Sequence, residues 1–357
     1  MKIALLNLPY DNNYGGNLQR YALMKVLQDM GHEVTHLNLR FHYYLPWYRK
    51  PYSYLKRILL KYIFGRDVKI NQEIFLQQRY EAHCAITEPF YQKYIKHTPR
   101  INNLRELSSF SDFDAYVVGS DQVWRKSIAK KFLGTMFLDF LVRKEGVKRI
   151  AYGISLGNSE NELNPKEIRF LGKLYNLFDA VSVREESALS LFGIYGWNSP
   201  KARVVLDPTF LLEKSDYLKL IRNARTEPSK GNMFCYILDN NVEIQKKMLE
   251  MEQKLGLKSF YVSLQGDTSV SVEQWLRSFD DAEYVITDSY HGLLFSIIFN
   301  KPFYLIHNSK RGNARFEMIL STFQLQDKNE IVEWEELNTK LFKERIKSIQ
   351  YLNACNI

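Results

Sequence analysis

The sequence predicts an α/β protein built from two doubly wound domains that face each other across a cleft. The chain has 357 residues, which is enough for about two domains that each have a core. Short apolar runs of strand length alternate with helical stretches, and this rhythm is typical of right-handed βαβ units with a parallel sheet. Asp207 and Pro208 interrupt the alternation, which then begins again. We therefore expect one sheet in each half of the chain.

Composition excludes several other classes of protein. Hydrophobic residues make up 45% and charged residues 25% of the chain, which fits neither a disordered nor a polytopic membrane protein. Cys84, Cys235 and Cys355 lie far apart and are odd in number, so we expect neither a disulfide framework nor a paired zinc site. The first residues lack the apolar region and the cleavage site of a signal peptide. Together these features favour the cytoplasm.

The first half of the chain is expected to hold a complete α/β domain, residues 1–206. Its strands are expected at residues 2–8, 32–39, 115–118, 149–155, 180–183 and 203–206. The first helix, 17–30, follows a glycine-containing loop and ends before Gly31. Asn164 and Pro165 begin another helix, because asparagine caps helix N-termini and the fixed φ of proline suits the first helical position. A further helix is expected over 185–192.

The second half repeats the pattern over residues 207–325. Strands are expected at residues 233–238, 259–264, 284–287 and 302–306, and helices at 242–255, 272–279 and 289–299. A C-terminal helical segment, 326–357, is expected to pack back on the first domain. Ligands of such folds bind beyond the carboxyl ends of the strands, so the loops after the strands are the expected site.

A basic, aromatic insertion at about residues 40–66 supplies most of the net charge of +9. No Asp or Glu occurs between Val34 and Arg66. A helical apolar stripe is formed by Leu55, Ile58, Leu59, Tyr62 and Ile63. The other side of this helix carries Lys56, Arg57 and Lys61. Either the helix lies on an anionic membrane surface or its stripe packs on the protein core. Nucleic-acid binding is not expected, because the charge outside this window is small.

Two strand-end loops could bind a sugar or an anion. Gly15, Gly16 and Asn17 lie at a helix start, where free backbone amides receive anions and hydroxyls, although the glycines could serve only the geometry of the cap. Asp121, Gln122 and Trp124 follow the strand at 115–118 and combine a carboxylate, an amide and an indole, a common combination in sugar sites. The alternative is that Ser120 and Asp121 only cap a turn.

A third strand-end loop opens an apolar helix with Ser289, Tyr290, His291 and Gly292. An imidazole in the first turn of such a helix is well placed to hydrogen-bond or protonate an anionic ligand.

Cations near two other strand ends could hold an anion. Arg184 follows the strand at 180–183 and either pairs with Glu185 and Glu186 or reaches a carboxylate or phosphate group of a ligand. Further cations after the last strand are Lys310, Arg311 and Arg315.

Six motifs together resemble the polysaccharide pyruvyl transferase family, in order, from residue 12 to about residue 325. They are N-Y-G-G-N-L-Q-R-Y-A-L, V-V-G-S-D-Q-V-W-R, A-Y-G-I-S-L-G, S-V-R-E-E-S, V-L-D-P-T-F-L-L and V-I-T-D-S-Y-H-G-L-L-F-S-I-I-F-N-K-P-F. The resemblance implies two Rossmann-like domains arranged as in GT-B glycosyltransferases, with the acceptor on the N-terminal side and the donor on the C-terminal side. It also implies that phosphoenolpyruvate gives its enolpyruvyl carbon to two hydroxyls of a sugar and forms a pyruvate ketal.

The same resemblance implies roles for particular residues. Arg184 and His291 match the family's Arg and His that bind or activate phosphoenolpyruvate. Many relatives carry an arginine two positions before this histidine, where the chain has Ser289, so Lys310, Arg311 or Arg315 is the candidate for the missing cation. Tyr290 and Gly292 are assigned to the donor site with Ser289.

Mechanistic expectations follow from this chemistry. We expect His291 to act as the acid or to position the phosphate, with a pKa near the working pH, while Arg184 holds the carboxylate or phosphate. Asp121, the second catalytic candidate, would orient the sugar with Gln122 and Trp124. The scheme requires no metal and no cofactor, since phosphoenolpyruvate is the co-substrate.

The expected acceptor is a saccharide carried on a polyprenyl diphosphate, at the inner face of a bacterial membrane that the 40–66 insertion contacts. This places the reaction in the synthesis of capsule, exopolysaccharide or cell-wall polymer. Two alternatives are a GT-B glycosyltransferase that uses a nucleotide sugar and a non-catalytic module of a membrane glycan assembly complex.

Overall fold

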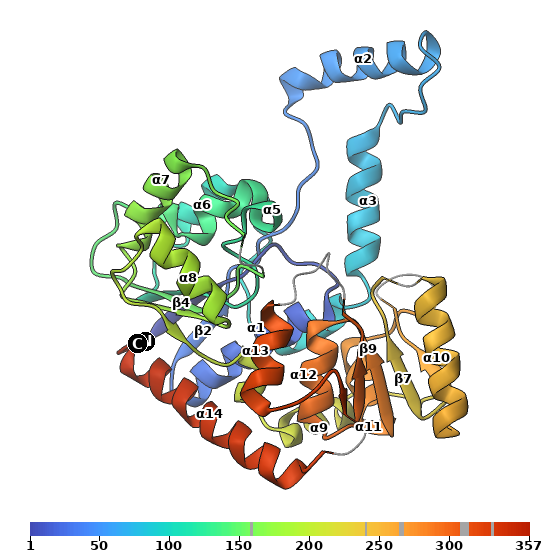
Figure 1. Ribbon diagram of the computed structural model, residues 1–357. Coiled ribbons are helices and arrows are strands. Elements are labelled where there is room, and N and C mark those ends of the chain that lie inside the picture. Colours follow the sequence, from blue (N-terminus) through green and yellow to red (C-terminus); the bar gives the residue numbers. More distant parts are fainter. Residues whose placement is uncertain (158–159, 240, 264–267, 308–313, 330–331) are drawn as a thin grey trace.

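Two sheets organise the computed structural model of the chain, and helices cover their faces (Figure 1). The structure describes residues 1–157, 160–239, 241–263, 268–307, 314–329 and 332–357. The part of the chain built on the first sheet is called the first unit, and the part built on the second sheet is called the second unit. This GT-B-like α/β architecture confirms the fold expected from the sequence.

Six strands of the described chain form the first sheet, all parallel, in the order β2-β1-β3-β4-β5-β6. Their bounds are β1 Lys2–Leu6, β2 Glu33–His36, β3 Ala115–Val118, β4 Lys148–Ile154, β5 Ala180–Val183 and β6 Arg203–Val204. The strands expected in the first half are confirmed, with β3 and β5 matching to the residue. Since β3 pairs with β1 on the side opposite β2, the strand order reverses between β1 and β3.

The second sheet has the order β11-β10-β9-β7-β8 over the described residues. Its strands are β7 Met233–Tyr236, β8 Ser259–Tyr261, β9 Tyr284–Thr287, β10 Phe303–Leu305 and β11 Lys328–Asn329. β11 runs antiparallel to β10, so the expectation of a purely parallel sheet is wrong at this edge. A strand of two residues is too short to produce an apolar run in the sequence. Here the order reverses between β7 and β9.

Helices connect the strands in both units. The part of the described chain outside residues 40–84 is called the body. Its α-helices are α1 Tyr14–Asp29, α4 Glu88–Tyr94, α5 Lys126–Ala129, α6 Leu133–Met136, α7 Pro165–Tyr175, α8 Glu186–Tyr195, α9 Lys214–Arg222, α10 Val242–Leu255, α11 Val272–Asp281, α12 Tyr290–Ile298, α13 Ala314–Phe323 and α14 Trp334–Ala354. The expected cap of α7 is confirmed, because Asn164 and Glu167 form a capping box. Gly256, at φ 65°, ends α10 as expected.

The hydrophobic core continues from one unit into the other. One cluster of buried side chains contains Leu5 and Leu23 of the first unit together with Phe234, Trp275 and Phe295 of the second. Two further clusters cover the remaining faces of the sheets. The two units are therefore packed against each other through apolar contacts.

The C-terminal helix α14 runs beneath both units (Figure 1). The Ser348 hydroxyl accepts a hydrogen bond from the backbone of Leu206 at 3.0 Å, just beyond β6. Arg345 donates to the carbonyl oxygens of Phe210 and Leu212 at 2.7 and 3.0 Å. The ring of Tyr351 lies 6.4 Å from that of Tyr152 in β4, so α14 contacts the first sheet.

The basic, aromatic insertion forms a helical arm that projects from the body (Figure 1). The insertion contains a short 3₁₀ helix, η1 (Trp47–Arg49), and α2 (Lys50–Tyr62), and the arm continues beyond the insertion with α3 (Gln72–Cys84). None of the residues of α2, all of which the structure describes, is buried. The interpretation in which the apolar stripe packs on the core is therefore wrong. Across the described chain, no helix is both long enough and apolar enough to cross a membrane.

Candidate active site

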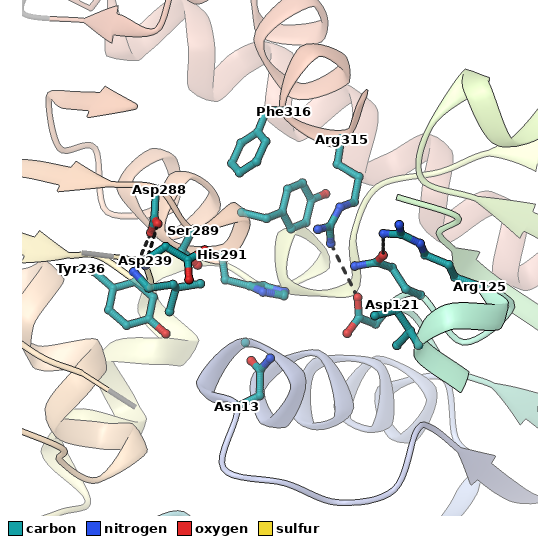
Figure 2. Close-up of a pocket in the computed structure, with 15 residues that line it drawn as sticks. Asn13, Asp121, Arg125, Tyr236, Asp239, Asp288, Ser289, His291, Arg315 and Phe316 are labelled. Carbon is teal, nitrogen blue, oxygen red and sulfur yellow. Dashed lines mark hydrogen bonds and ion pairs between the residues drawn. The ribbon is translucent and has the colours of Figure 1, made fainter. Parts of the chain in front are cut away.

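A cavity of about 430 Å³ lies where the two units meet, and it is called the interdomain pocket (Figure 2). Its described lining residues are Asn13, Gly15, Asp121, Gln122, Arg125, Ile128, Tyr236, Leu238, Asp239, Asp288, Ser289, Tyr290, His291, Arg315 and Phe316. They come from the loops after β1, β3, β7 and β9, from the last residue of β7, and from α1, α5, α12 and α13. Both points where strand order reverses thus open into one cavity, which is where α/β folds of this kind bind their ligands.

The start of α1 is fixed against the second unit. The Asn13 side chain caps the helix by accepting a hydrogen bond from the backbone of Gly16 at 3.0 Å, so α1 begins three residues earlier than expected. Tyr14 stacks on Trp275 with ring centroids 5.4 Å apart. The Tyr14 hydroxyl donates to the carbonyl of Val270 at 2.9 Å. These contacts hold the free amides of α1 at the border of the pocket.

His291 enters the pocket from the first turn of α12, whose N-cap is Ser289. Gly15 allows the imidazole to approach α1, because a Cβ at that position would lie 2.0 Å from Nδ1 of His291. Among the described residues, Nε2 of His291 has no hydrogen-bond partner although it is buried. Figure 2 shows the ring pointing toward the side of the pocket that holds Asp121 and Arg315.

The surroundings of His291 keep its imidazole neutral. Burial lowers its pKa to about 4; Asp207 and Asp121 oppose this shift, whereas Arg184 and Arg315 add to it. The expectation of a pKa near the working pH is therefore wrong for the folded chain by itself. An anion bound beside the ring would raise that pKa again, because a negative charge favours the imidazolium.

Asp121 lies in the loop after β3, with a backbone φ of 84° in the left-handed region. Aspartate tolerates this conformation better than most residues. Its carboxylate lies 3.2 Å from Nη2 of Arg184 and 3.7 Å from Nη1 of Arg315. Burial alone would raise the pKa of Asp121, but the two arginines lower it below its ordinary value, so the carboxylate is ionised.

Arg184 belongs to a buried ion-pair network behind the pocket. Its Nη1 pairs with Asp207, which also accepts hydrogen bonds from Gln19 at 2.6 Å and from the Thr209 hydroxyl at 2.8 Å. Arg184 is not among the described residues that line the interdomain pocket, and it borders a second cavity of about 230 Å³ instead. The expected direct grip of Arg184 on a ligand is not what the structure shows, because two carboxylates already hold its guanidinium.

Arg315 supplies the guanidinium that faces the pocket, in the company of Tyr290. The Tyr290 ring lies 4.9 Å from the guanidinium carbon of Arg315 and 5.0 Å from that of Arg184. Burial, and then the nearby Arg184, lower the pKa of Arg315, but an arginine remains charged at neutral pH. A positive charge on Arg315 is thus held close to His291 at one side of the pocket.

Several expected site residues lie elsewhere. Trp124, an expected sugar platform, is core: its indole stacks on Phe137 at 4.2 Å and donates to the carbonyl of Met136 at 2.8 Å. Asn17 uses its amide on the carbonyls of Asp11 and Asn13. Gly16, Asn17, Gly292 and Trp124 are absent from the described lining of the pocket. Lys310 and Arg311 lie outside the described residues.

Other lining residues were missed, notably Asn13, Asp239 and Phe316. Asp239 had a signal, since it lies three residues after the end of β7, just as Asp121 lies three residues after the end of β3. Asp288 fixes the position of this loop, because its carboxylate accepts hydrogen bonds from the backbones of Leu238 and Asp239 at 2.7 and 3.0 Å. Within the described residues, no group of three or more His, Cys, Asp or Glu side chains is arranged to hold a metal ion.

Comparison with known proteins identifies a matching family model and solved structures to which the chain is similar. The family model described as "Polysaccharide pyruvyl transferase" matches residues 13–310. A comparison with curated proteins returns no match. Among solved structures, the chain is similar to UDP-GlcNAc 2-epimerase from Methanocaldococcus jannaschii, at 11% identity over 96% of this chain and 91% of that chain, with a TM-score of 0.48. It is similar to UDP-GlcNAc 2-epimerase from Neisseria meningitidis at 10% identity over 98% and 93%, with a TM-score of 0.46.

Proposed function

The chain belongs to the polysaccharide pyruvyl transferase family and is a transferase, and we propose that its interdomain pocket transfers the enolpyruvyl group of phosphoenolpyruvate to two hydroxyls of a saccharide. The product is a cyclic pyruvate ketal. The observation that carries the proposal is one cavity bordered by two helix N-termini, the Arg315 guanidinium and the unpartnered Nε2 of His291. These groups suit a small, highly charged anion.

The reaction balances with phosphoenolpyruvate as co-substrate. The methylene carbon takes a proton, which leaves an oxocarbenium-like centre at C2. One sugar hydroxyl attacks C2 and the bond from C2 to the phosphate oxygen breaks, so phosphate leaves. The second hydroxyl then closes the ring. Of the two hydroxyl protons, one replaces the proton taken up at the methylene carbon and the other leaves with phosphate. The scheme uses no metal or further cofactor, so we expect EDTA to leave phosphate release unchanged.

His291 is the proposed proton carrier. A neutral imidazole cannot donate a proton as an imidazolium, so the acid role requires His291 to gain a proton when the donor binds. The negative charge of phosphoenolpyruvate favours this uptake. Nε2, which has no partner in the described chain, is the nitrogen available to the ligand. Ser289 and Tyr290 complete this side of the donor site with the amides at the start of α12.

Arg315 is the proposed donor-binding cation. It lines the pocket, whereas the position two residues before His291 carries Ser289. A guanidinium binds carboxylate or phosphate through paired hydrogen bonds. Arg184 then acts as a positioning residue, because it holds Asp121 and contacts the ring of Tyr290 from behind the pocket.

The acceptor is a saccharide in this proposal, held on the side of Asp121. Asp121, Gln122 and Asp239 line the pocket with oxygen and nitrogen atoms that can hydrogen-bond sugar hydroxyls. We place the acceptor on a polyprenyl diphosphate at the inner face of the cytoplasmic membrane, during synthesis of capsule, exopolysaccharide or cell-wall polymer. The exposed helical arm supports this location.

Thermal stabilisation by ligands tests the proposal directly. We expect phosphoenolpyruvate to raise the melting temperature of the full chain, whereas UDP- and CDP-sugars leave it unchanged. Phosphate release in the presence of acceptor is expected to be lost in His291→Ala and retained in His42→Gln, an exposed histidine outside the pocket. Stabilisation by a nucleotide sugar and not by phosphoenolpyruvate would identify a glycosyltransferase and overturn the assignment.

A further inference from the structure

The helix α2 exposes one continuous apolar face. Tyr52, Leu55, Leu59 and Tyr62 recur at the spacing of a single helix face, and their side chains are 72%, 58%, 40% and 71% exposed. Further aromatic and apolar residues lie before and after α2, namely Trp47, Tyr48, Ile63 and Phe64, and all four are exposed. A contiguous patch of this kind on a protein surface marks an interaction site.

An ion pair turns that face away from the rest of the chain. Arg57 lies on the side of α2 opposite the apolar face. It donates to both carboxylate oxygens of Glu73 in α3, at 2.6 and 2.5 Å, and to the carbonyl of Ile70 at 3.0 Å. The bidentate pair joins α2 to α3 through the polar side, so the apolar side faces solvent.

The charges around the apolar face suit an anionic surface. Lys56 borders the face, whereas Lys50, in the first turn of α2, and Lys61 lie on the polar side with Arg57. All three lysines are exposed, and no Asp or Glu occurs between Val34 and Arg66. Long lysine side chains can lay their methylene groups along an apolar layer while their ammonium groups reach anionic headgroups. Pairing of two copies through this face would bring like charges together.

We propose that the helical arm docks on a lipid bilayer that contains anionic lipids, with the apolar face of α2 among the headgroups. Trp47, Tyr48 and Tyr62 provide the amphipathic rings that favour this depth. α3, with 13 residues and a length of about 20 Å, separates α2 from the body (Figure 1). The inference deepens the proposed function, on which it rests for the lipid-linked acceptor, by naming the surface that meets the membrane.

Vesicle binding by the full chain tests the proposal. We expect co-sedimentation with vesicles of phosphatidylglycerol and phosphatidylcholine, at least tenfold weaker binding to pure phosphatidylcholine, and weakening by salt. The Leu55→Gln, Leu59→Gln, Tyr62→Gln variant is expected to bind at least tenfold more weakly. The Lys50→Gln, Lys56→Gln, Lys61→Gln variant should lose the preference for anionic vesicles.

A matched control separates specific docking from net charge. Lys166→Gln, Lys173→Gln, Lys246→Gln removes the same number of exposed lysines from the body and is expected to bind vesicles like the unmodified chain. Because no residue of the fully described α2 is buried, all arm variants should keep the melting temperature.

Two outcomes would overturn the proposal. One is equal binding of the unmodified chain and the apolar-face variant to vesicles. The other is a dimer in sedimentation velocity that the apolar-face variant dissociates, without vesicle binding by either protein. Stabilisation by phosphoenolpyruvate is measured without vesicles, so failure of the proposed function would be seen separately.

Discussion

Two arginines that contact the same tyrosine ring differ in what else surrounds them. Arg184 pairs with Asp207 and Asp121 in the interior, whereas Arg315 lines the interdomain pocket. A buried charge that loses its partner is costly, because the remaining charge has no water to solvate it. Substitution of the two arginines should therefore have different consequences.

Arg184→Gln should destabilise the fold, while Arg315→Gln should weaken donor binding. We expect Arg184→Gln to lower the free energy of unfolding by about 3–5 kcal/mol, the cost of breaking a buried ion pair. Arg315→Gln should raise the KM for phosphoenolpyruvate at least tenfold and change the melting temperature little. Urea unfolding and steady-state phosphate release measure the two effects. An unchanged KM for phosphoenolpyruvate in Arg315→Gln would show that Arg315 does not bind the donor.

His291 should make the fold sensitive to acid. Its pKa is about 4 in the folded chain against an ordinary value of 6.5, so the folded state favours the neutral ring. The free energy of unfolding therefore has its full value above pH 6.5. It decreases as the pH falls from 6.5 toward 4, because the imidazole then binds a proton in the unfolded chain but not in the folded chain. The difference corresponds to about 3 kcal/mol. Urea unfolding between pH 7 and 4 should show a smaller loss of stability for His291→Gln than for the unmodified chain.

At the scale of elements, the start of α1 requires a glycine at position 15 because His291 packs closely against it, and not because of the backbone conformation. A Cβ on Gly15 would lie 2.0 Å from Nδ1 of His291, whereas a Cβ on Gly16 would find its nearest neighbour at 3.6 Å, an ordinary contact. Both glycines are in α1, where alanine is favoured over glycine.

Gly15→Ala and Gly16→Ala form a matched pair of variants. We expect Gly15→Ala to displace His291 or to part the two units, with a loss of phosphate release of at least tenfold. Gly16→Ala should leave phosphate release unchanged and alter the free energy of unfolding by less than about 1 kcal/mol. Equal activity of the two variants would show that the close approach of Gly15 to His291 does not matter for turnover.

The elements that the sequence predicted best are those with local signals. Asn164 marks the start of α7 and Gly256 marks the end of α10. Both could be predicted because capping involves only neighbouring residues. The buried strands β3 and β5 were predicted to the residue from short apolar runs.

The failures have long-range causes. The indole of Trp124 packs among residues far along the chain, such as Phe178 and Phe192. Arg184 forms an ion pair with Asp207, which follows β6, and this pair keeps its guanidinium behind the interdomain pocket. The exposure of α2 depends on Glu73 of another helix. None of these contacts leaves a local pattern in the sequence. The location of the interdomain pocket could therefore be predicted, but the full set of residues that line it could not.

At the scale of the whole molecule, the contact between the units decides whether the pocket exists. The pocket takes its lining from both units, and the buried cluster that contains Leu5 and Phe234 continues across their contact. Tyr14 adds a polar connection, since its hydroxyl donates to the carbonyl of Val270 at 2.9 Å and accepts from the Val270 backbone nitrogen at 3.1 Å.

Because the core is shared, we expect both units to unfold in one cooperative transition by calorimetry. Tyr14→Phe should keep that single transition and lower the free energy of unfolding by about 1–3 kcal/mol, since the backbone of Val270 is left without its partner. Tyr62→Phe, on the exposed face of α2, is the matched control and should leave the transition unchanged. Two resolved transitions in the unmodified chain would show that the units are independent, and the geometry of His291 against Gly15 would then depend on ligand binding to bring them together.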